Sequence, residues 1–168
     1  GSVVLAYAND EVWICQFVSS ETTLFMGQAR QPVTYTMTST LPWQGNVTIK
    51  LGMESSLKFR LAIRLPAWAE DCVVNLNGSR IKPPLSNPKE PMRAANGLNF
   101  NASRWMVLER EFHPGDEINI EFEMPIRLAV QDKRVPKCGR KLVVTRGPVV
   151  YCLESLDNAQ DIFKTTIK

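Results

Sequence analysis

The sequence is poor in the groups on which most catalytic side-chain chemistry depends. It contains one histidine, His113, and four widely separated cysteines without a C-x-x-C pair: Cys15, Cys72, Cys138 and Cys152. No metal site built from local ligand pairs is expected, and any Ser–His or Cys–His nucleophile would depend on this one imidazole beside Pro114. We interpret His113 as a solvated turn residue. We interpret the cysteines as buried thiols, with disulfides as the less favoured alternative, because Cys15 and Cys152 lie in apolar runs.

Long apolar runs and a strong charge are also missing. No stretch approaches the roughly 18 apolar residues of a membrane span, and no succession of charged, apolar and small residues marks a signal peptide. The formal net charge is +3, and the basic residues are spread along the chain rather than gathered in a run. Neither nucleic acid nor a membrane is therefore expected as a partner.

The composition is that of an ordinary globular chain. Hydrophobic residues make up 44% and charged residues 22% of the 168 residues, which is typical of a folded domain and excludes disorder and coiled coil. The chain starts at Gly1 rather than at a methionine, and residues 1–2 have the sequence of a remnant left by tag removal. We therefore expect an excised fragment, a reading that leaves the compartment open.

Strict alternation of apolar and polar residues dominates the sequence and predicts strands with one buried face. It extends over residues 33–37, 47–53, 58–65 and 117–124. Less regular apolar runs predict further strands, buried on both faces or switching between sheets, over residues 12–18, 23–26, 73–76, 106–112 and 142–153. About ten strands are expected in all.

The residues between the strands favour antiparallel hairpins. Asn77-Gly78 and Asn96-Gly97 supply the positive φ of type I′ turns, and Pro114-Gly115 presets a type II turn. The glycine of Arg146-Gly147-Pro148 is not part of a phosphate loop, because the following proline has no N–H to offer. We interpret this triplet as a corner leading into a buried strand over residues 149–154.

Strands with one buried face must pack sheet against sheet, so we expect an antiparallel two-layer β-sandwich, similar to a jelly roll. The proline-rich segment 83–95 is expected to be a surface loop, and residues 156–164 at most one short C-terminal helix. We favour a single domain over residues 3–168. Two smaller sandwiches, over 3–68 and 69–168, are the alternative.

The acidic residues do not indicate a glycosidase active site. Hydrolysis of a glycoside needs two carboxyl groups facing each other across a cleft. Glu109, Glu111, Glu117, Glu121 and Glu123 are instead spaced by two or four along strands, as on an outward polar face. We assign no catalytic residue to this chain.

Two tryptophans carry a binding hypothesis, because sugar-binding sandwiches stack sugar rings on exposed aromatic side chains. Trp43 and Trp68 each lie close to a proline at a strand end. The alternative, which we favour, is that these rings close the edge of the core or contact a neighbouring domain. Trp13 and Trp105 lie within strand patterns and are expected in the core.

An ordered series of short motifs supports a family resemblance over nearly the whole chain, from about Tyr7 to Asp157. It consists of Arg64-Leu65-Pro66-Ala67-Trp68-Ala69, Val74-Asn75-Leu76-Asn77-Gly78, Trp105 with Gly115-Asp116, Met124-Pro125-Ile126-Arg127, and Arg146-Gly147-Pro148-Val149-Val150-Tyr151-Cys152-Leu153-Glu154. This series resembles the region that follows the catalytic barrel in bacterial β-L-arabinofuranosidase-type glycoside hydrolases.

The resemblance implies an architecture and a parent enzyme. In that family the catalytic unit is an (α/α)6 barrel, and a cysteine nucleophile on a zinc ion with cysteine and glutamate ligands performs the hydrolysis. Because no cysteine here stands beside a second one, no catalytic or metal residue is carried over, and no cofactor is expected in the fragment. The resemblance implies an accessory β-sandwich whose partner is the barrel of the same polypeptide, in an enzyme acting on arabinose-containing plant glycans.

Overall fold

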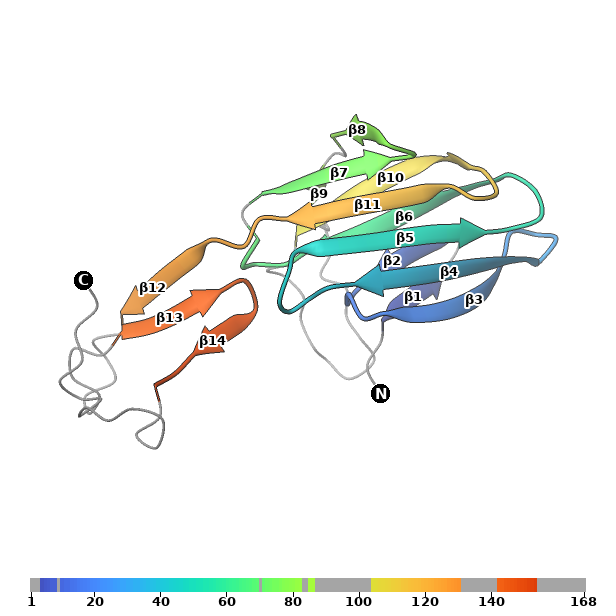
Figure 1. The fold of residues 1–168 in the computed structure, drawn as a ribbon. Coiled ribbons are helices and arrows are strands. Elements are labelled where there is room, and N and C mark those ends of the chain that lie inside the picture. The colour runs from blue at the N-terminus through green and yellow to red at the C-terminus, as the bar shows by residue number, and fades with distance from the viewer. Residues whose placement is uncertain are drawn as a thin grey trace. The chain divides into compact units, whose positions relative to one another are not determined.

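The structure, a computed structural model, describes residues 4–8, 10–69, 71–82, 85–86, 104–130 and 142–153. Every regular element among these residues is a strand, and the fourteen strands form three sheets (Figure 1). The all-β class expected from the alternating sequence is therefore confirmed. No helix that could cross a membrane occurs in these described ranges.

The chain divides into two compact units, Gly1–Glu123 and Met124–Lys168. This division differs both from the expected single domain over 3–168 and from the alternative boundary between residues 68 and 69. Strands β6 (Leu57–Leu65) and β7 (Cys72–Leu76) flank that alternative boundary, yet they lie in the two sheets of one sandwich and share one core. The two units are described separately below.

One layer of the first unit is a five-stranded sheet, referred to as sheet A, in the order β1-β2-β6-β10-β9. Its pairs are antiparallel except for β2 and β6, which run parallel. Besides β6 it contains β1 (Leu5–Ala8), β2 (Glu11–Ile14), β9 (Leu85–Ser86) and β10 (Arg104–Phe112).

The other layer is a six-stranded antiparallel sheet, referred to as sheet B, in the order β3-β4-β5-β11-β7-β8. Besides β7 it contains β3 (Ser20–Met26), β4 (Gln31–Ser39), β5 (Asn46–Gly52), β11 (Glu117–Phe122) and β8 (Ser79–Ile81). Its outer face carries threonine and charged side chains, including the Thr23–Thr34 hydroxyl pair at 2.9 Å.

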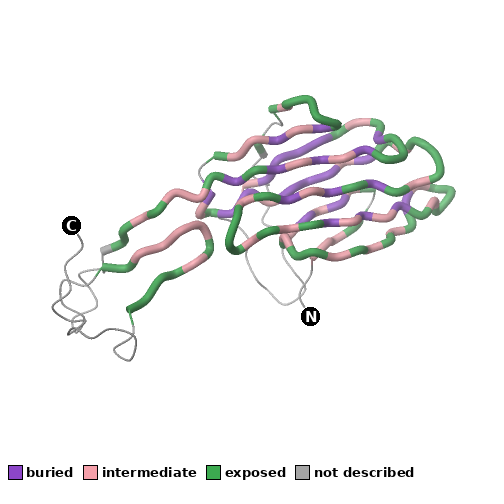
Figure 2. Tube along the Cα trace, viewed as in Figure 1, coloured by how far each residue is buried: buried purple, intermediate pink, exposed green. Residues whose placement is uncertain are grey.

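The main core lies between the two sheets and follows the predicted alternation (Figure 2). On β6, Phe59, Leu61 and Ile63 are buried against the inner face of sheet B. The ring of Phe59 stacks on that of Phe112, with centroids 4.4 Å apart. Burial of these apolar groups is the main stabilising contribution to the sandwich.

A second apolar cluster lies on the opposite, outer face of sheet A. Trp13, Ala62 and Val107 stand in one row across β2, β6 and β10, next to Trp105 and Cys15. Trp105 and Val107 are buried, whereas Trp13 is half-buried. The expectation that the two tryptophans belong to the core therefore holds in a modified form, because their cluster is not the one between the sheets.

Two of the predicted turns are confirmed. Asn77 and Gly78 both have positive φ, 50° and 78°, in the two-residue turn between β7 and β8. Gly115, with φ 83°, closes the turn between β10 and β11, where the Asp116 N–H donates to the His113 carbonyl oxygen at 3.1 Å. The predicted turn at Asn96-Gly97 lies outside the described residues.

The expected loop over residues 83–95 is described only at β9, where Leu85 and Ser86 pair with Met106 and Trp105. The expected C-terminal helix over 156–164 and the tag remnant at 1–2 lie outside the described residues.

The second unit contains an antiparallel sheet of three strands, β12 (Ile126–Val130), β13 (Leu142–Arg146) and β14 (Val149–Tyr151). Gly147, with φ 56°, forms the predicted corner between β13 and β14. The expected burial of the strand after this corner is wrong, because 64% of Val150 is exposed. No second sheet covers this one among the described residues of the unit.

Candidate functional site

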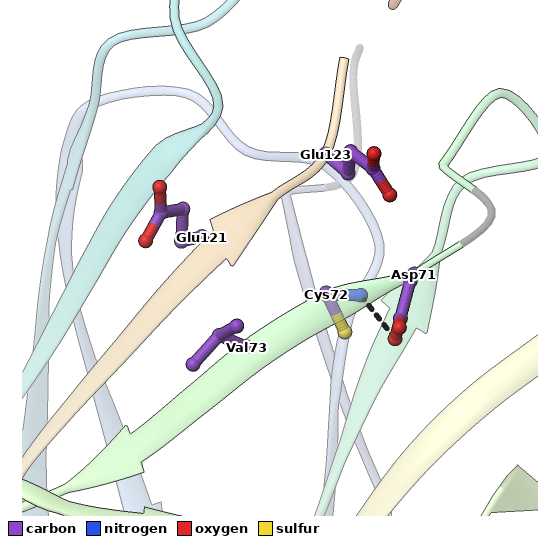
Figure 3. A pocket seen from close by; sticks show the side chains of 5 residues that line it. All are labelled: Asp71, Cys72, Val73, Glu121 and Glu123. Carbon is purple, nitrogen blue, oxygen red and sulfur yellow. Dashed lines mark hydrogen bonds between the residues drawn. The ribbon is translucent and has the colours of Figure 1, made fainter. Parts of the chain in front are cut away.

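A shallow hollow lies where β11 ends and β7 begins (Figure 3). It has a volume of about 250 Å³, and its lining residues are Asp71, Cys72, Val73, Glu121 and Glu123. The carboxylate of Asp71 accepts a hydrogen bond from the Cys72 backbone N–H at 2.8 Å. The carboxylates are spread around the hollow rather than directed at one point. Consistent with this, no group of three His, Cys, Asp or Glu side chains in the described ranges could hold a metal ion.

The thiol in the hollow is not an activated nucleophile. Burial raises the pKa of Cys72, and the negative charge of Asp71 raises it further, against a smaller opposing effect of Arg104. Its Sγ lies 3.3 Å from the sulfur of Met106. A thiol with a raised pKa is protonated at neutral pH and reacts slowly.

The described cysteines are free thiols, as favoured from the sequence. Cys15 and Cys72 are half-buried, and burial also raises the pKa of Cys15. Cys152 is exposed, so its predicted burial is wrong; it follows β14, in a sheet that no second sheet covers among the described residues of its unit. Cys138 lies outside the described residues.

The single imidazole has a serine partner, and no acid among the described residues is bonded to its ring. Nδ1 of His113 lies 2.7 Å from the hydroxyl of Ser56 on the neighbouring turn, and both side chains are exposed. The carboxylate of Asp116 accepts a hydrogen bond from the backbone N–H of His113, not from the ring. A triad requires the acid to orient the imidazole, so this pair lacks the geometry of a catalytic centre.

The acids on the strands form the expected polar surface. Glu109, Glu111 and Glu121 are exposed, and Glu117 forms an ion pair with Lys50 at 3.0 Å. The hydrogen bond from Asn119 lowers the pKa of Glu117, and the contact with Lys50 lowers it further. No shift of this kind creates the protonated acid that glycoside hydrolysis requires.

The two candidate tryptophans occupy different environments. The side chain of Trp43 is 67% exposed in the loop between β4 and β5. Trp68 is half-buried, and its ring packs edge-on against Phe122 with centroids 5.6 Å apart. On the other side, Phe122 also contacts the ring of Phe17, with centroids 4.9 Å apart. Trp68 therefore closes the end of the core, whereas Trp43 is largely exposed.

A set of hydrogen bonds centred on one buried carboxylate joins two turns at the opposite end of the sandwich, and the sequence did not predict it. Asp116 is only 4% exposed, and its carboxylate accepts hydrogen bonds from Asn77 Nδ2 at 2.7 Å and from the His113 N–H at 3.0 Å. Asn77 Oδ1 accepts from the Glu117 N–H at 2.8 Å. We call Asn77, Asp116 and Glu117 the turn lock. The sequence showed both turns but not their pairing.

Comparison with known proteins decides the family. A family model described as the middle domain of GH127 β-L-arabinofuranosidase matches residues 11–124, and one for the C-terminal domain of glycoside hydrolase family 127 matches residues 126–168. The chain belongs to glycoside hydrolase family 127. The junction between the two matches coincides with the boundary between the two units of the family 127 chain.

The known relatives are much longer than this family 127 chain. A curated non-reducing end β-L-arabinofuranosidase from Bifidobacterium longum subsp. longum is 26% identical over 131 residues, which cover 74% of the chain but 17% of the relative. A solved GH127 β-L-arabinofuranosidase from Geobacillus stearothermophilus superposes with a TM-score of 0.74 at 24% identity, over 95% of the chain and 23% of that structure. A solved GH127 β-arabinofuranosidase gives 0.73 at 20% identity, over 95% and 25%. The two solved structures share the fold.

The motifs behind the family resemblance hold turns and packing contacts in the structure. The Ala69 N–H donates to the Pro66 carbonyl oxygen at 3.0 Å, and Arg104 donates to the Ala69 carbonyl oxygen at 3.2 Å. Trp68 packs on the core between these contacts, as described above. In the described part of the family 127 chain, Pro66, Trp68 and Ala69 therefore hold a turn at the end of the core.

Proposed function

We propose that this chain is the non-catalytic accessory region of a family 127 glycoside hydrolase, and that it docks on the catalytic (α/α)6 barrel of the same polypeptide. The observation that carries the proposal is that the two family domains that match, the middle and C-terminal ones, account for residues 11–124 and 126–168. A rigid sandwich is suited to bracing a larger domain, and such interfaces typically bury about 600–1,500 Å². The parent enzyme would act on arabinose-containing plant glycans.

The sheet of the second unit offers an apolar surface for such docking. Ile126, Leu128 and Tyr151 lie on one face of it, by the pairing of β12, β13 and β14, and they are 71%, 53% and 48% exposed. Contiguous exposed apolar groups of this kind mark interaction surfaces. A sheet of three strands also needs packing on an apolar face to be stable.

Zinc, which the family resemblance implies for the parent enzyme, does not fit the described residues of this chain. Cys15, Cys72 and Cys152 are separate, and no three candidate ligands converge. We propose that the metal and the nucleophile of the parent enzyme lie outside the described residues of this chain.

Binding to the remainder of the parent enzyme, produced separately, tests the docking proposal. We expect the chain to bind it, and we expect Ile126→Lys and Tyr151→Lys each to weaken binding about tenfold or more, as for central interface residues. Thr38→Lys, at an exposed position on the outer face of sheet B, is the matched control and should leave binding unchanged. Absence of binding, or equal loss with Thr38→Lys, would contradict the proposal.

An assay of the isolated chain with an aryl arabinofuranoside tests the non-catalytic role. We expect no turnover, because the thiol that shares the hollow with acids, Cys72, has a raised pKa, and the carboxylates around it do not converge on one point. Measurable hydrolysis that persists through purification would contradict this part of the proposal.

A carbohydrate-binding module is the rival hypothesis, and the exposed ring of Trp43 is the one observation in its favour. Calorimetry with arabinan or arabinogalactan oligosaccharides separates the two roles. Millimolar or tighter binding that Trp43→Ala abolishes would favour the module. Because Trp68 packs on Phe122, Trp68→Ala is not a suitable test of sugar binding.

A further inference from the structure

The turn between β7 and β8 places an Asn–Gly pair at an exposed position. Because glycine has no Cβ, its backbone nitrogen can approach and attack the side-chain carbonyl carbon of the preceding asparagine, which makes this dipeptide chemically labile. Apart from Gly78 and its two chain neighbours, no described residue has an atom within 4 Å of the place that a Cβ of Gly78 would occupy. Nothing nearby therefore shields the Gly78 nitrogen on that side.

The turn lock holds the reactive carboxamide by both of its ends. Asn77 Nδ2 donates to Asp116 Oδ1 at 2.7 Å, and Asn77 Oδ1 accepts from the Glu117 N–H at 2.8 Å. The Asn77 backbone N–H also donates to the Glu117 carbonyl oxygen at 2.9 Å. Movement of the carboxamide onto the Gly78 nitrogen requires these side-chain hydrogen bonds to break first.

We infer that Asn77 is a site of spontaneous deamidation and that the turn lock controls its rate. The Gly78 nitrogen attacks Cγ of Asn77, the bond from Cγ to Nδ2 breaks, and ammonia leaves with the proton of the Gly78 N–H. The product is a five-membered succinimide. Water then opens the ring, at Cγ to give aspartate or at the main-chain carbonyl carbon to give isoaspartate, and no oxidant or reductant is needed.

The modification would break the lock that had delayed it. An aspartate at position 77 places a second carboxylate against Asp116, where a 2.7 Å hydrogen bond existed before. Like charges at this separation repel, and the contact is only partly exposed to water. Isoaspartate adds a methylene group to the main chain, which the two-residue turn cannot accommodate without losing its register.

Peptide mapping by mass spectrometry after incubation of the 168-residue chain at neutral pH tests the inference. The conversion of Asn77 is compared in the folded and in the urea-denatured chain, with the second Asn–Gly pair, Asn96-Gly97, as the internal reference. We expect Asn77 to convert at least about tenfold more slowly in the folded chain, the factor that one charge-assisted hydrogen bond supplies.

A variant separates the lock from general protection by folding. Asp116→Asn weakens the contact with Asn77 and should accelerate conversion of Asn77 about tenfold in a chain that circular dichroism shows to be folded. The rate at Asn96 should not change. Equal rates at Asn77 in the folded and denatured chain would overturn the inference. An unchanged rate at Asn77 in the folded Asp116→Asn chain would do so too.

Discussion

At the scale of single residues, Asp116 is the one buried polar or charged residue among those that the structure describes. Its buried carboxylate accepts hydrogen bonds from Asn77 and from the His113 backbone, and so joins the turn after β7 to the turn after β10. We expect Asp116→Asn to lower the free energy of unfolding by about 1–3 kcal/mol, because the Asn77 side chain and the His113 N–H lose their charged acceptor. Urea unfolding followed by circular dichroism measures the change.

Glu121 provides the matched control for that substitution. It is an acid in β11, the strand that follows Asp116, but its side chain is exposed. Glu121→Gln should change the free energy of unfolding by less than about 0.5 kcal/mol, as at other exposed positions. If both variants had the same stability as the parent chain, the turn lock would have no energetic importance.

The charge of Asp116 also predicts how stability depends on pH. Burial raises its pKa, but the hydrogen bonds from Asn77 and the His113 N–H, with the positive charge of Arg110, outweigh burial and hold the pKa below its ordinary value. The unfolded chain therefore binds this proton more readily than the folded chain. The stabilisation is complete above the ordinary aspartate range and is lost as pH falls through the lowered pKa.

Unfolding free energies measured from neutral to strongly acidic pH check this expectation. The difference in stability between the parent chain and Asp116→Asn should be constant near neutrality and should shrink as the solution becomes acidic. A difference that stays constant through the acid range would show that the folded and unfolded pKa values of Asp116 are equal.

At the scale of elements, the loop between β4 and β5 is clamped against the end of β11. The Phe122 N–H donates to the Gly45 carbonyl oxygen at 2.9 Å, and a Cβ on Gly45 would collide with the backbone carbonyl of Phe122. We expect Gly45→Ala to destabilise the sandwich by about 1–3 kcal/mol, because the obstacle is main chain and cannot rotate away. Chemical denaturation measures the change in the free energy of unfolding, and thermal unfolding provides a second measure of stability.

Gly52, in β5, is the control for Gly45. A Cβ there would meet Thr34 at an ordinary 3.5 Å, and its φ does not lie in the left-handed region. Gly52→Ala should therefore be neutral or slightly stabilising. A loss with Gly52→Ala as large as that with Gly45→Ala would contradict the clamp.

Strand positions and turn types could be predicted from the sequence because both depend on neighbouring residues. The alternation from Phe59 to Leu65 and the pairs Asn77-Gly78 and Pro114-Gly115 fix a buried face or a backbone conformation locally. The family resemblance was likewise carried by these local motifs, and the family models confirmed it.

Contacts between distant segments could not be predicted in the same way. The parallel pairing of β2 with β6 and the bond between Asn77 and Asp116 join residues that are far apart in sequence. The burial of Trp105 and Val107 on the outer face of sheet A could not be predicted for a related reason. Alternation tells which residues share a face, as Trp105 and Val107 do, but not what covers it.

At the scale of the whole molecule, the main core belongs entirely to the first unit. Among the described residues, the buried members of that core run from Val12 to Phe122. The second unit contributes a separate three-stranded sheet with exposed apolar side chains. We therefore expect a chain of residues 1–123 to fold alone, with one cooperative unfolding transition. Residues 124–168 alone should remain unfolded, because a small sheet without a packed face is marginal in water.

Dividing the chain at the alternative boundary, between residues 68 and 69, provides a comparison that distinguishes the two ways of dividing it into units. Separation between residues 68 and 69 would divide the sandwich through its core, because β6 would lose its neighbour β10, and β5 would lose its neighbour β11. Neither piece should then show a cooperative transition, although both are longer than the second unit. Circular dichroism and urea unfolding of the four pieces compare the two boundaries directly. Cooperative folding of residues 3–68 or 69–168, or an unfolded chain of residues 1–123, would mean that the units have been divided at the wrong place.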